Sequence, residues 1–385
     1  MSNHTLHRFL VVSAVYVVLS GAPVWAGPFS DLIVFGDSLS DTGNVSLATF
    51  GIHPGLHYYD GRFSNGPAYA DVLATNLGLG PLTPSAAGGG NFAHGAAQTS
   101  GTGFFTGLAV DDVDDQIDDF LARGPADPDA LFVVLAGAND LFFGQTNVSV
   151  PVNNLVNDLQ RLIGAQARNF LVMNIPLLGT TPRFNQNAFE ASAMNSLSVD
   201  FNSQLAVALD DLEASHPAVD FFRLDVAELI SDGIANPAAY GFTNVTDPAA
   251  PGLESGKVFY NRNQIVSDPD TYLFWDDIHP TAAAHAVLAE HALAAVRSPG
   301  DFNFDGDVNG LDFLLWQTDS SVGLMSDWQA NFAPSAIATT SSLVPEPTTS
   351  VLALAALAFA VGRRHRPARI RSTAVSKNSR QSRAA

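Results

Sequence analysis

Residues 31–41 read DLIVFGDSLSD, and this stretch indicates the fold class of the chain. The apolar run 32–35 is typical of a strand that is buried on both faces of a parallel sheet. Gly36 ends the run and permits a sharp turn where a side chain would clash. Ser38 is therefore predicted to lie just beyond the carboxyl end of a strand, where open α/β sheets bind ligands. The alternative is that the polar residues 38–41 only cap the next helix.

Apolar runs of the same kind recur along the chain, with helical patterns between them. Strands that alternate with helices favour an α/β fold whose parallel sheet is covered by helices on both faces. The segment 235–271 is rich in Pro, Gly and Asn and is predicted to form an irregular loop region over the site. The predicted buried strands are 131–135, 169–174 and 219–224, and the predicted helices are 152–167, 196–215 and 281–296.

Ser38 needs a base if it is to act as a nucleophile, because a serine hydroxyl is weakly reactive at neutral pH. The stretch 276–280 reads DDIHP and offers one. His279 follows Asp276 by three residues, which lets the carboxylate hold one imidazole nitrogen while the other faces Ser38. Asp277 is the alternative orienting carboxylate. The alternative for the whole stretch is an ordinary helix start with a carboxylate cap.

Asn139 follows the predicted strand 131–135 within the stretch GAND, residues 137–140. A side-chain amide at this place can donate a hydrogen bond to the oxyanion of a tetrahedral intermediate. Asn-Asp after a strand is also common in turns, so this stretch alone is weak evidence. Residues 88–95, GGGNFAHG, are predicted to form a flexible loop whose backbone N–H could approach the same site.

Together these stretches resemble the GDSL/SGNH hydrolases over roughly residues 31–297. The matching blocks are Gly36 to Leu39, Gly95, Gly137 to Asp140, and Asp276 to His279. The resemblance is to the lipolytic branch, which includes lipases, lecithinase-like phospholipases and acyltransferases. It implies a flavodoxin-like three-layer α/β/α SGNH-hydrolase fold, an acyl-ester substrate and catalysis without a cofactor.

The resemblance also implies a role for each matching residue. Ser38 would be the nucleophile, His279 the base and Asp276 its orienting carboxylate. The oxyanion hole would consist of the Ser38 and Gly95 backbone N–H groups and the Asn139 amide. Two departures from the family pattern are mild, because neither removes a needed chemical group: Ala96 replaces a frequent second glycine, and Ala138 fills a variable position.

The chain is strongly acidic, with a formal net charge of −20 at pH 7. Nine of the 18 basic residues lie before residue 27 or after residue 347, whereas all 38 acidic residues lie between, so that central part carries −29. Such a surface repels nucleic acid and anionic lipid, and no nucleic-acid partner is expected. The chain has no cysteine, which excludes disulfides and zinc–thiolate sites.

The first 26 residues are predicted to be a secretory signal peptide. Its apolar core, 10–19, follows Arg8 and precedes a cleavage site after Ala26. An uncleaved membrane anchor is the alternative, although the apolar run is short for a span. The protein is therefore expected to be exported, with residues 27–297 as the hydrolase domain.

Residues 298–334 are predicted to form a small α-helical, EF-hand-like or dockerin-like segment that binds Ca²⁺. Gly306 stands where an EF-hand loop turns sharply, and the last ligand is Asp rather than Glu, which resembles dockerin repeats. Only one full loop is present, so calcium-stiffened spacing is favoured over binding of a scaffold cohesin. The alternative is a loop merely rich in Asp, Asn and Gly. The candidate ligands are Asp301, Asn303, Asp305, Asp307, Asn309 and Asp312.

The C-terminal part is predicted to contain a linker, 335–344, a sorting and anchor segment, 345–369, and a basic cytoplasmic tail, 370–385. An apolar stretch, 351–361, is followed by arginines, which predicts a membrane segment with its basic end in the cytoplasm. The order resembles the PEP-CTERM sorting signal, which implies removal of the anchor by exosortase-type machinery and a final location at the cell surface or exterior. A plain tail anchor is the alternative.

The sequence therefore favours an exported serine ester hydrolase. The competing hypothesis is a calcium-dependent surface or scaffold-attachment protein whose hydrolase domain is vestigial. The resemblance leaves the acyl chain length and the choice between hydrolysis and acyl transfer open.

Overall fold

The computed structural model describes residues 28–332 apart from 102, 106–107 and 305. Its central parallel sheet contains, in order across the sheet, β1 (Leu32–Gly36), β4 (Leu131–Leu135), β5 (Asn169–Met173) and β6 (Asp220–Leu224). Leu32 lies opposite Leu131, and Phe132 lies opposite Phe170, so apolar residues meet between neighbouring strands. The predicted α/β fold with a parallel sheet is thereby confirmed.

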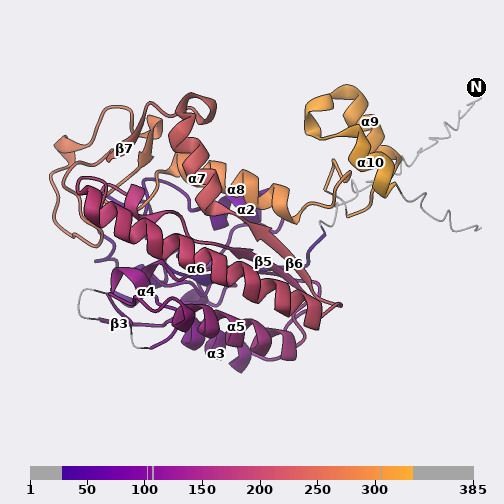
Figure 1. Cartoon of the computed structure of the whole chain (residues 1–385), viewed down its shortest axis with the longest axis horizontal. Helices are drawn as coiled ribbons and strands as arrows, with labels where there is room; N and C mark the ends of the chain where they lie inside the picture. Colours follow the sequence, from indigo (N-terminus) through magenta and orange to yellow (C-terminus); the bar gives the residue numbers. More distant parts are fainter. Residues whose placement is uncertain (1–27, 102, 106–107, 305, 333–385) are drawn as a thin grey trace, which may run out of the picture. The chain divides into compact units, whose positions relative to one another are not determined.

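Helices cover both faces of this sheet (Figure 1). Successive side chains of a strand point to opposite faces, so each strand supplies two cores. Ile33 and Phe35 of β1 pack into the first core, whereas Leu32 and Val34 pack into the second. The first core is completed by α3 (Val113–Ala122), α5 (Ser149–Gly164) and α6 (Ala188–Ser215), and the second by α2 (Tyr69–Asn76), α7 (Val226–Ala235) and α8 (Ala282–Val296).

The glycine-rich segment 88–95, predicted as a flexible loop, instead extends along the outer edge of β1. Three backbone hydrogen bonds join the two: Val34 N–H to Gly90, Phe92 N–H to Val34, and His94 N–H to Gly36. A Cβ on Gly90 would lie 2.6 Å from the Leu32 carbonyl oxygen, so only glycine allows this approach. The segment thereby delivers Gly95 to the carboxyl end of β1.

Two element predictions need correction. The strand at 219–224 was predicted to be buried, but β6 is the edge of the sheet and its side chains are exposed or half-buried. The helix predicted from residue 196 begins eight residues earlier at Ala188, where the Asn187 side chain accepts the N–H groups of Phe189 and Glu190. The segment 235–271 is largely irregular, as expected.

Shorter elements complete the described chain. They are the helices α1 (Asn44–Ala48), α4 (Ala138–Phe142), α9 (Gly310–Thr318) and α10 (Met325–Asn331), the antiparallel pair β2 (Gly103–Phe105) and β3 (Leu108–Val110), and the parallel pair β7 (Asn244–Pro248) and β8 (Tyr272–Phe274). Six short 3₁₀ turns connect them: Ser85–Ala87, Leu178–Thr180, Pro237–Tyr240, Arg262–Gln264, Pro269–Thr271 and Ser320–Val322.

The predicted signal peptide and the predicted linker, sorting segment and basic tail lie outside the described residues. Among the helices that are described, none is long and apolar enough to cross a membrane.

Gly137, which joins β4 to α4, provides a test of the packing. Its φ is +116°, and a Cβ there would lie 2.4 Å from the ring of Phe201 in α6. We expect Gly137→Ala to lower the free energy of unfolding by about 2–4 kcal/mol, because strain and overpacking add. Gly164→Ala is the matched control: nothing lies within 4 Å of its Cβ position, and a change within about 1 kcal/mol is expected. Urea unfolding measures both, and equal losses would contradict this account.

Candidate active site

Loops that follow strands bring the predicted site residues to one end of the sheet. Ser38 follows β1, Asn139 lies in α4 directly after β4, and Asp276 and His279 lie between β8 and α8. Thr281 caps α8 by accepting the N–H of Ala284, which fixes where that loop ends.

Ser38, His279 and Asp276 form a continuous hydrogen-bonded chain. Ser38 Oγ lies 2.7 Å from His279 Nε2, and His279 Nδ1 lies 2.7 Å from Asp276 Oδ2. This arrangement assigns the Nδ1–H to the carboxylate and leaves Nε2 to accept the serine proton. Both His279 and Asp276 are buried. The chain of contacts can pass a proton from the hydroxyl to the imidazole.

The buried carboxylate of Asp276 remains ionised. Burial acts to raise its pKa, but the charge of His279 and hydrogen bonds from His279 and Tyr58 outweigh it, so the pKa lies below its ordinary value. Asp276 Oδ1 also accepts the N–H groups of Ile278, at 2.9 Å, and His279, at 2.6 Å.

Asp277, the alternative orienting carboxylate, points elsewhere. Its Oδ2 lies 2.7 Å from Arg183 Nε, and its Oδ1 accepts the N–H of Ser255 at 2.8 Å. The structure therefore pairs the imidazole with Asp276 and uses Asp277 to hold two neighbouring loops.

Tyr58 is a member of the site that sequence reasoning missed. Its hydroxyl donates to Asp276 Oδ2 at 2.6 Å, the same oxygen that receives the imidazole. Tyr58 is buried and its neighbour Tyr59 is exposed. No local pattern distinguishes these two tyrosines, because only the packing of their loop decides which one faces the carboxylate.

Asn139 has the geometry of a donor. It is buried, and one hydrogen of its amide bonds the Ala97 carbonyl at 2.9 Å. An amide nitrogen carries two hydrogens, so a second remains for an oxyanion. Ser38 N–H has no acceptor among the described residues and is likewise available.

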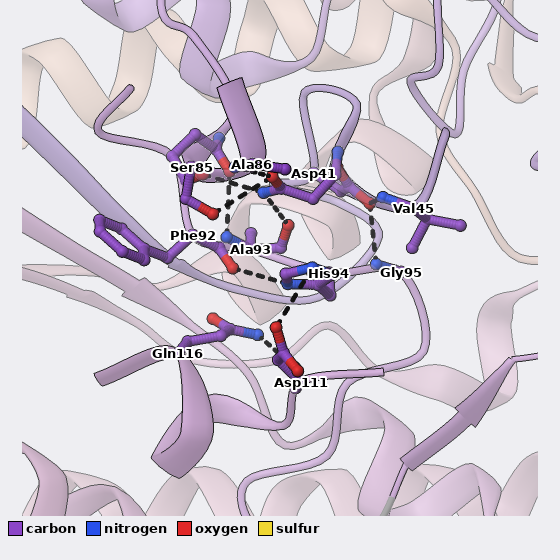
Figure 2. Close-up of polar contacts among 12 residues, drawn as sticks. Asp41, Val45, Ser85, Ala86, Phe92, Ala93, His94, Gly95, Asp111 and Gln116 are labelled. Carbon is purple, nitrogen blue, oxygen red and sulfur yellow. Dashed lines mark hydrogen bonds and ion pairs between the residues drawn. The ribbon is translucent and has the colours of Figure 1, made fainter. Parts of the chain in front are cut away.

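Gly95, predicted to donate its N–H to the oxyanion, donates it instead to Asp41 Oδ2 at 3.0 Å (Figure 2). The same carboxylate accepts the N–H groups of Gly43, Asn44 and Val45 at the start of α1. Asp41, rather than Ser38, therefore holds the beginning of the next helix. Of the predicted oxyanion donors, Ser38 N–H and the Asn139 amide keep a hydrogen free in this structure, and the role of the set stays a prediction.

Glycine at position 95 has a steric reason. A Cβ there would lie 2.2 Å from the ring tip of Phe63, whose centroid is 5.2 Å from that of His279. Gly95 thus leaves room for Phe63 to pack against the imidazole. The next residue, Ala96, has a φ of +69°, a conformation that favours glycine and accounts for the family's frequent second glycine.

Two more carboxyl groups support the turns that carry the site. Burial raises the pKa of Asp37 to about 6, and burial also raises the pKa of Asp140 to about 6. Asp37 accepts the N–H of Leu39 at 3.0 Å, and Asp140 accepts the hydroxyl of Thr99 at 2.7 Å. These bonds hold the turns around Ser38 and Asn139.

The candidate calcium ligands lie before and at the start of α9. Asp301 Oδ2 accepts the N–H of Gly306 at 2.9 Å, and Asp312 Oδ1 accepts the N–H of Phe302 at 2.7 Å, so both buried carboxylates close the loop on itself. Asp305 lies outside the described residues. Over the described ranges, no group of three or more His, Asp or Glu side chains is placed to hold a metal ion. Calcium binding therefore stays a prediction.

Comparison with known proteins gives the same family as the resemblance noted in the sequence, that of the GDSL hydrolases. The family model for GDSL-like lipases and acylhydrolases matches residues 32–292. A phosphatidylcholine-sterol acyltransferase from Aeromonas hydrophila is 28% identical, over 71% of this chain and 92% of that protein. A GDSL esterase/lipase from Arabidopsis thaliana is 30% identical, over 69% and 82%. The esterase EstA of Pseudomonas aeruginosa is 27% identical, over 84% of this chain and 55% of its own.

Tyr58 should affect the pH dependence of any reaction at this site. Tyr58→Phe removes a donor that favours the ionised form of Asp276, so the carboxylate becomes more basic and stabilises the imidazolium more strongly. We expect the acid limb of kcat/KM to move to higher pH by less than about one unit, because the lost hydrogen bond is worth on the order of 1.5 kcal/mol at the carboxylate and only part of it reaches the imidazole. Tyr59→Phe, the exposed neighbour, should leave the limb in place. An unmoved limb in both variants would remove Tyr58 from the site.

Proposed function

This chain belongs to the GDSL-like lipase and acylhydrolase family, and we propose that it is an exported serine ester hydrolase that uses Ser38 as its nucleophile. The observation that carries the proposal is the hydrogen-bonded chain of Ser38, His279 and Asp276 at the carboxyl end of the sheet. Serine nucleophiles require such an adjacent, oriented base.

The proposed reaction has two stages. Ser38 Oγ attacks the carbonyl carbon of an acyl ester while His279 Nε2 takes the hydroxyl proton. The Asn139 amide and Ser38 N–H stabilise the oxyanion, and the alcohol leaves with the proton that His279 returns. Water then attacks the acyl-enzyme with His279 as base and releases the carboxylic acid. Asp276 stays ionised throughout and holds the imidazole in the required tautomer.

Acyl transfer is the second candidate. It is favoured by the similarity to a phosphatidylcholine-sterol acyltransferase over most of that protein's length. In this variant an alcohol replaces water in the second stage, and the residues keep their roles. The vestigial-domain hypothesis is less well supported, because the three side chains retain hydrogen-bond distances throughout.

Export and sorting complete the proposal. We propose cleavage of the signal peptide 1–26 and processing of the PEP-CTERM segment 345–369 by exosortase-type machinery, with delivery to the cell surface or exterior. A Ca²⁺-binding segment at 298–334 would stiffen the spacing between the hydrolase domain and this anchor. A cohesin partner is less favoured.

Replacing Ser38 tests the nucleophile directly. Hydrolysis of p-nitrophenyl esters from acetate to palmitate should be measured for wild type, Ser38→Ala and the exposed helix variant Ser203→Ala. We expect Ser38→Ala to lower kcat by a factor of about 10⁴ or more and Ser203→Ala to match wild type. Equal rates for wild type and Ser38→Ala would exclude Ser38 as nucleophile. The chain-length series also identifies the preferred acyl group.

Chelation tests the calcium segment. Removing Ca²⁺ should raise the protease sensitivity of residues 299–332 and leave ester hydrolysis unchanged, because the proposed proton relay needs no metal. Calorimetric titration of the chelated protein should show binding heat that Asp301→Ala abolishes. Absence of that heat would leave a loop that is only rich in Asp, Asn and Gly.

A further inference from the structure

The glycine-rich segment beside β1 pairs with it as a parallel strand would, except at one hydrogen bond. Val34 donates its N–H to the Gly90 carbonyl at 2.9 Å and accepts the N–H of Phe92 at 2.8 Å. This pattern repeats every two residues in a parallel ladder, so Gly36 should donate its N–H to the Phe92 carbonyl and accept the N–H of His94. The bond from His94 is present at 3.1 Å, whereas the bond to Phe92 is replaced.

Two side chains replace this bond. The Gly36 N–H donates to Oε1 of Gln116, a residue of α3, at 2.9 Å. The Phe92 carbonyl lies 2.9 Å from Nδ1 of His94, and this nitrogen is the donor because a carbonyl only accepts (Figure 2). The amide of Gln116 therefore takes the place of one strand residue beside the last residue of β1.

Gln116 holds Gly36 with both ends of its amide. Its Nε2 donates to the Gly36 carbonyl and to the Asp111 carbonyl, each at 2.9 Å (Figure 2). Both amide hydrogens and the amide oxygen are used, so only one orientation of the amide fits. Gln116 is only 1% exposed, so water has no access to replace these bonds.

Gly36 depends on such bonds because its position allows no side chain. It pairs with Leu135 of β4 on its inner side, and a Cβ would lie 2.3 Å from the Leu135 carbonyl oxygen. On its outer side the backbone is held by the Gln116 amide and the His94 N–H. Removing the amide would leave only one of these outer contacts.

The turn that carries Ser38 starts from Gly36. The Asp37 carbonyl accepts two N–H groups within this turn, each at 3.0 Å, so the turn is a compact unit. Ser38 Oγ lies 2.7 Å from His279 Nε2, and misplacing reacting groups by about 1 Å can cost about 10² in rate. A shift of Gly36 reaches Ser38 through a single intervening residue.

We propose that Gln116 is a positioning residue: its amide fixes the Gly36 backbone and thereby the place of Ser38 relative to the base. The inference rests on the proposed ester hydrolysis and adds to it a residue that acts through the backbone. A residue that only stabilises the fold would not change the turnover of molecules that are folded. A positioning residue lowers kcat in the folded molecules.

Asn202 of α6 offers a matched control. Its amide forms the same kind of pair with Ile175: Oδ1 accepts the Ile175 N–H at 3.1 Å, and Nδ2 donates to the Ile175 carbonyl at 2.7 Å. Ile175 is buried and lies just after β5, and no predicted catalytic residue lies on that loop. Gln116→Met and Asn202→Leu each replace the amide by an apolar side chain of similar volume.

The experiment compares the two variants with wild type in the full chain. Urea unfolding gives the folded fraction, and p-nitrophenyl butyrate hydrolysis gives kcat and KM. Both variants should unfold at lower urea concentration, because each leaves a buried N–H and carbonyl without their partner. Gln116→Met should lower kcat per folded molecule by about tenfold to hundredfold with KM within about twofold of wild type, whereas Asn202→Leu should keep the wild-type kcat.

Covalent labelling measures the nucleophile without turnover. A fluorophosphonate reacts with an activated serine, so Gln116→Met should slow the labelling of Ser38 by a factor similar to its loss of kcat. Gln116→Glu keeps an acceptor for the Gly36 N–H, and its kcat should lie between those of wild type and Gln116→Met. If Gln116→Met does not fold, a wild-type kcat in Gln116→Glu would overturn the inference.

Two further results would overturn the inference and leave the proposed function intact. One is a wild-type kcat in folded Gln116→Met. The other is an equal loss of kcat in Gln116→Met and Asn202→Leu, which would make Gln116 a structural residue only. Hydrolysis by wild type that Ser38→Ala does not reduce would instead overturn the proposed function, and the inference with it.

Discussion

The buried carboxylate of Asp276 is the group on which the site depends. It accepts four hydrogen bonds, from the imidazole and backbone N–H of His279, the backbone N–H of Ile278 and the hydroxyl of Tyr58. A charge without such partners is expensive to bury. The donors belong to two segments that are distant in the sequence. The Asp276 carboxylate therefore orients the imidazole and, through the Tyr58 hydroxyl, also holds the segment 50–58 against the loop before α8. The position of the segment 50–58 and the orientation of the imidazole are therefore set together.

The fold could be predicted where burial leaves a pattern in the sequence. Strands β1 and β4 are buried on both faces and appear as unbroken apolar runs. Strand β6 pairs only with β5 at the edge of the sheet, and its polar residues Asp220 and Arg223 interrupt the apolar run although Phe221 and Phe222 pack on opposite faces. The first turns of α6 are exposed, and its first buried side chain is Ser198, so no apolar periodicity marks the helix start at Ala188. These differences follow from tertiary packing, which local sequence does not encode.

The site residues likewise fall into those that the sequence predicts and those that only the packed structure reveals. Asp276 and His279 are three residues apart, and their contact is a local property of one loop. Tyr58 reaches the same carboxylate from 218 residues away, and only the packed structure selects it over Tyr59. Gly95 stands in the motif, yet its N–H bonds Asp41 and its missing side chain makes room for Phe63. A motif identifies which residues matter, whereas distances and contacts show what each one does.

The separation of Ser38 and His279 has a consequence for biosynthesis. They are 241 residues apart in the chain, and the loop that carries His279 is anchored by α8, the last helix to pack on the central sheet. In a chain that is still emerging from the ribosome, Ser38 is made early, whereas His279 is made only near the end of the family-matched region 32–292. Until α8 settles against α2 there is no competent proton acceptor beside the hydroxyl. The order of synthesis therefore completes the hydrogen-bonded chain of Ser38, His279 and Asp276 only after α8 has formed.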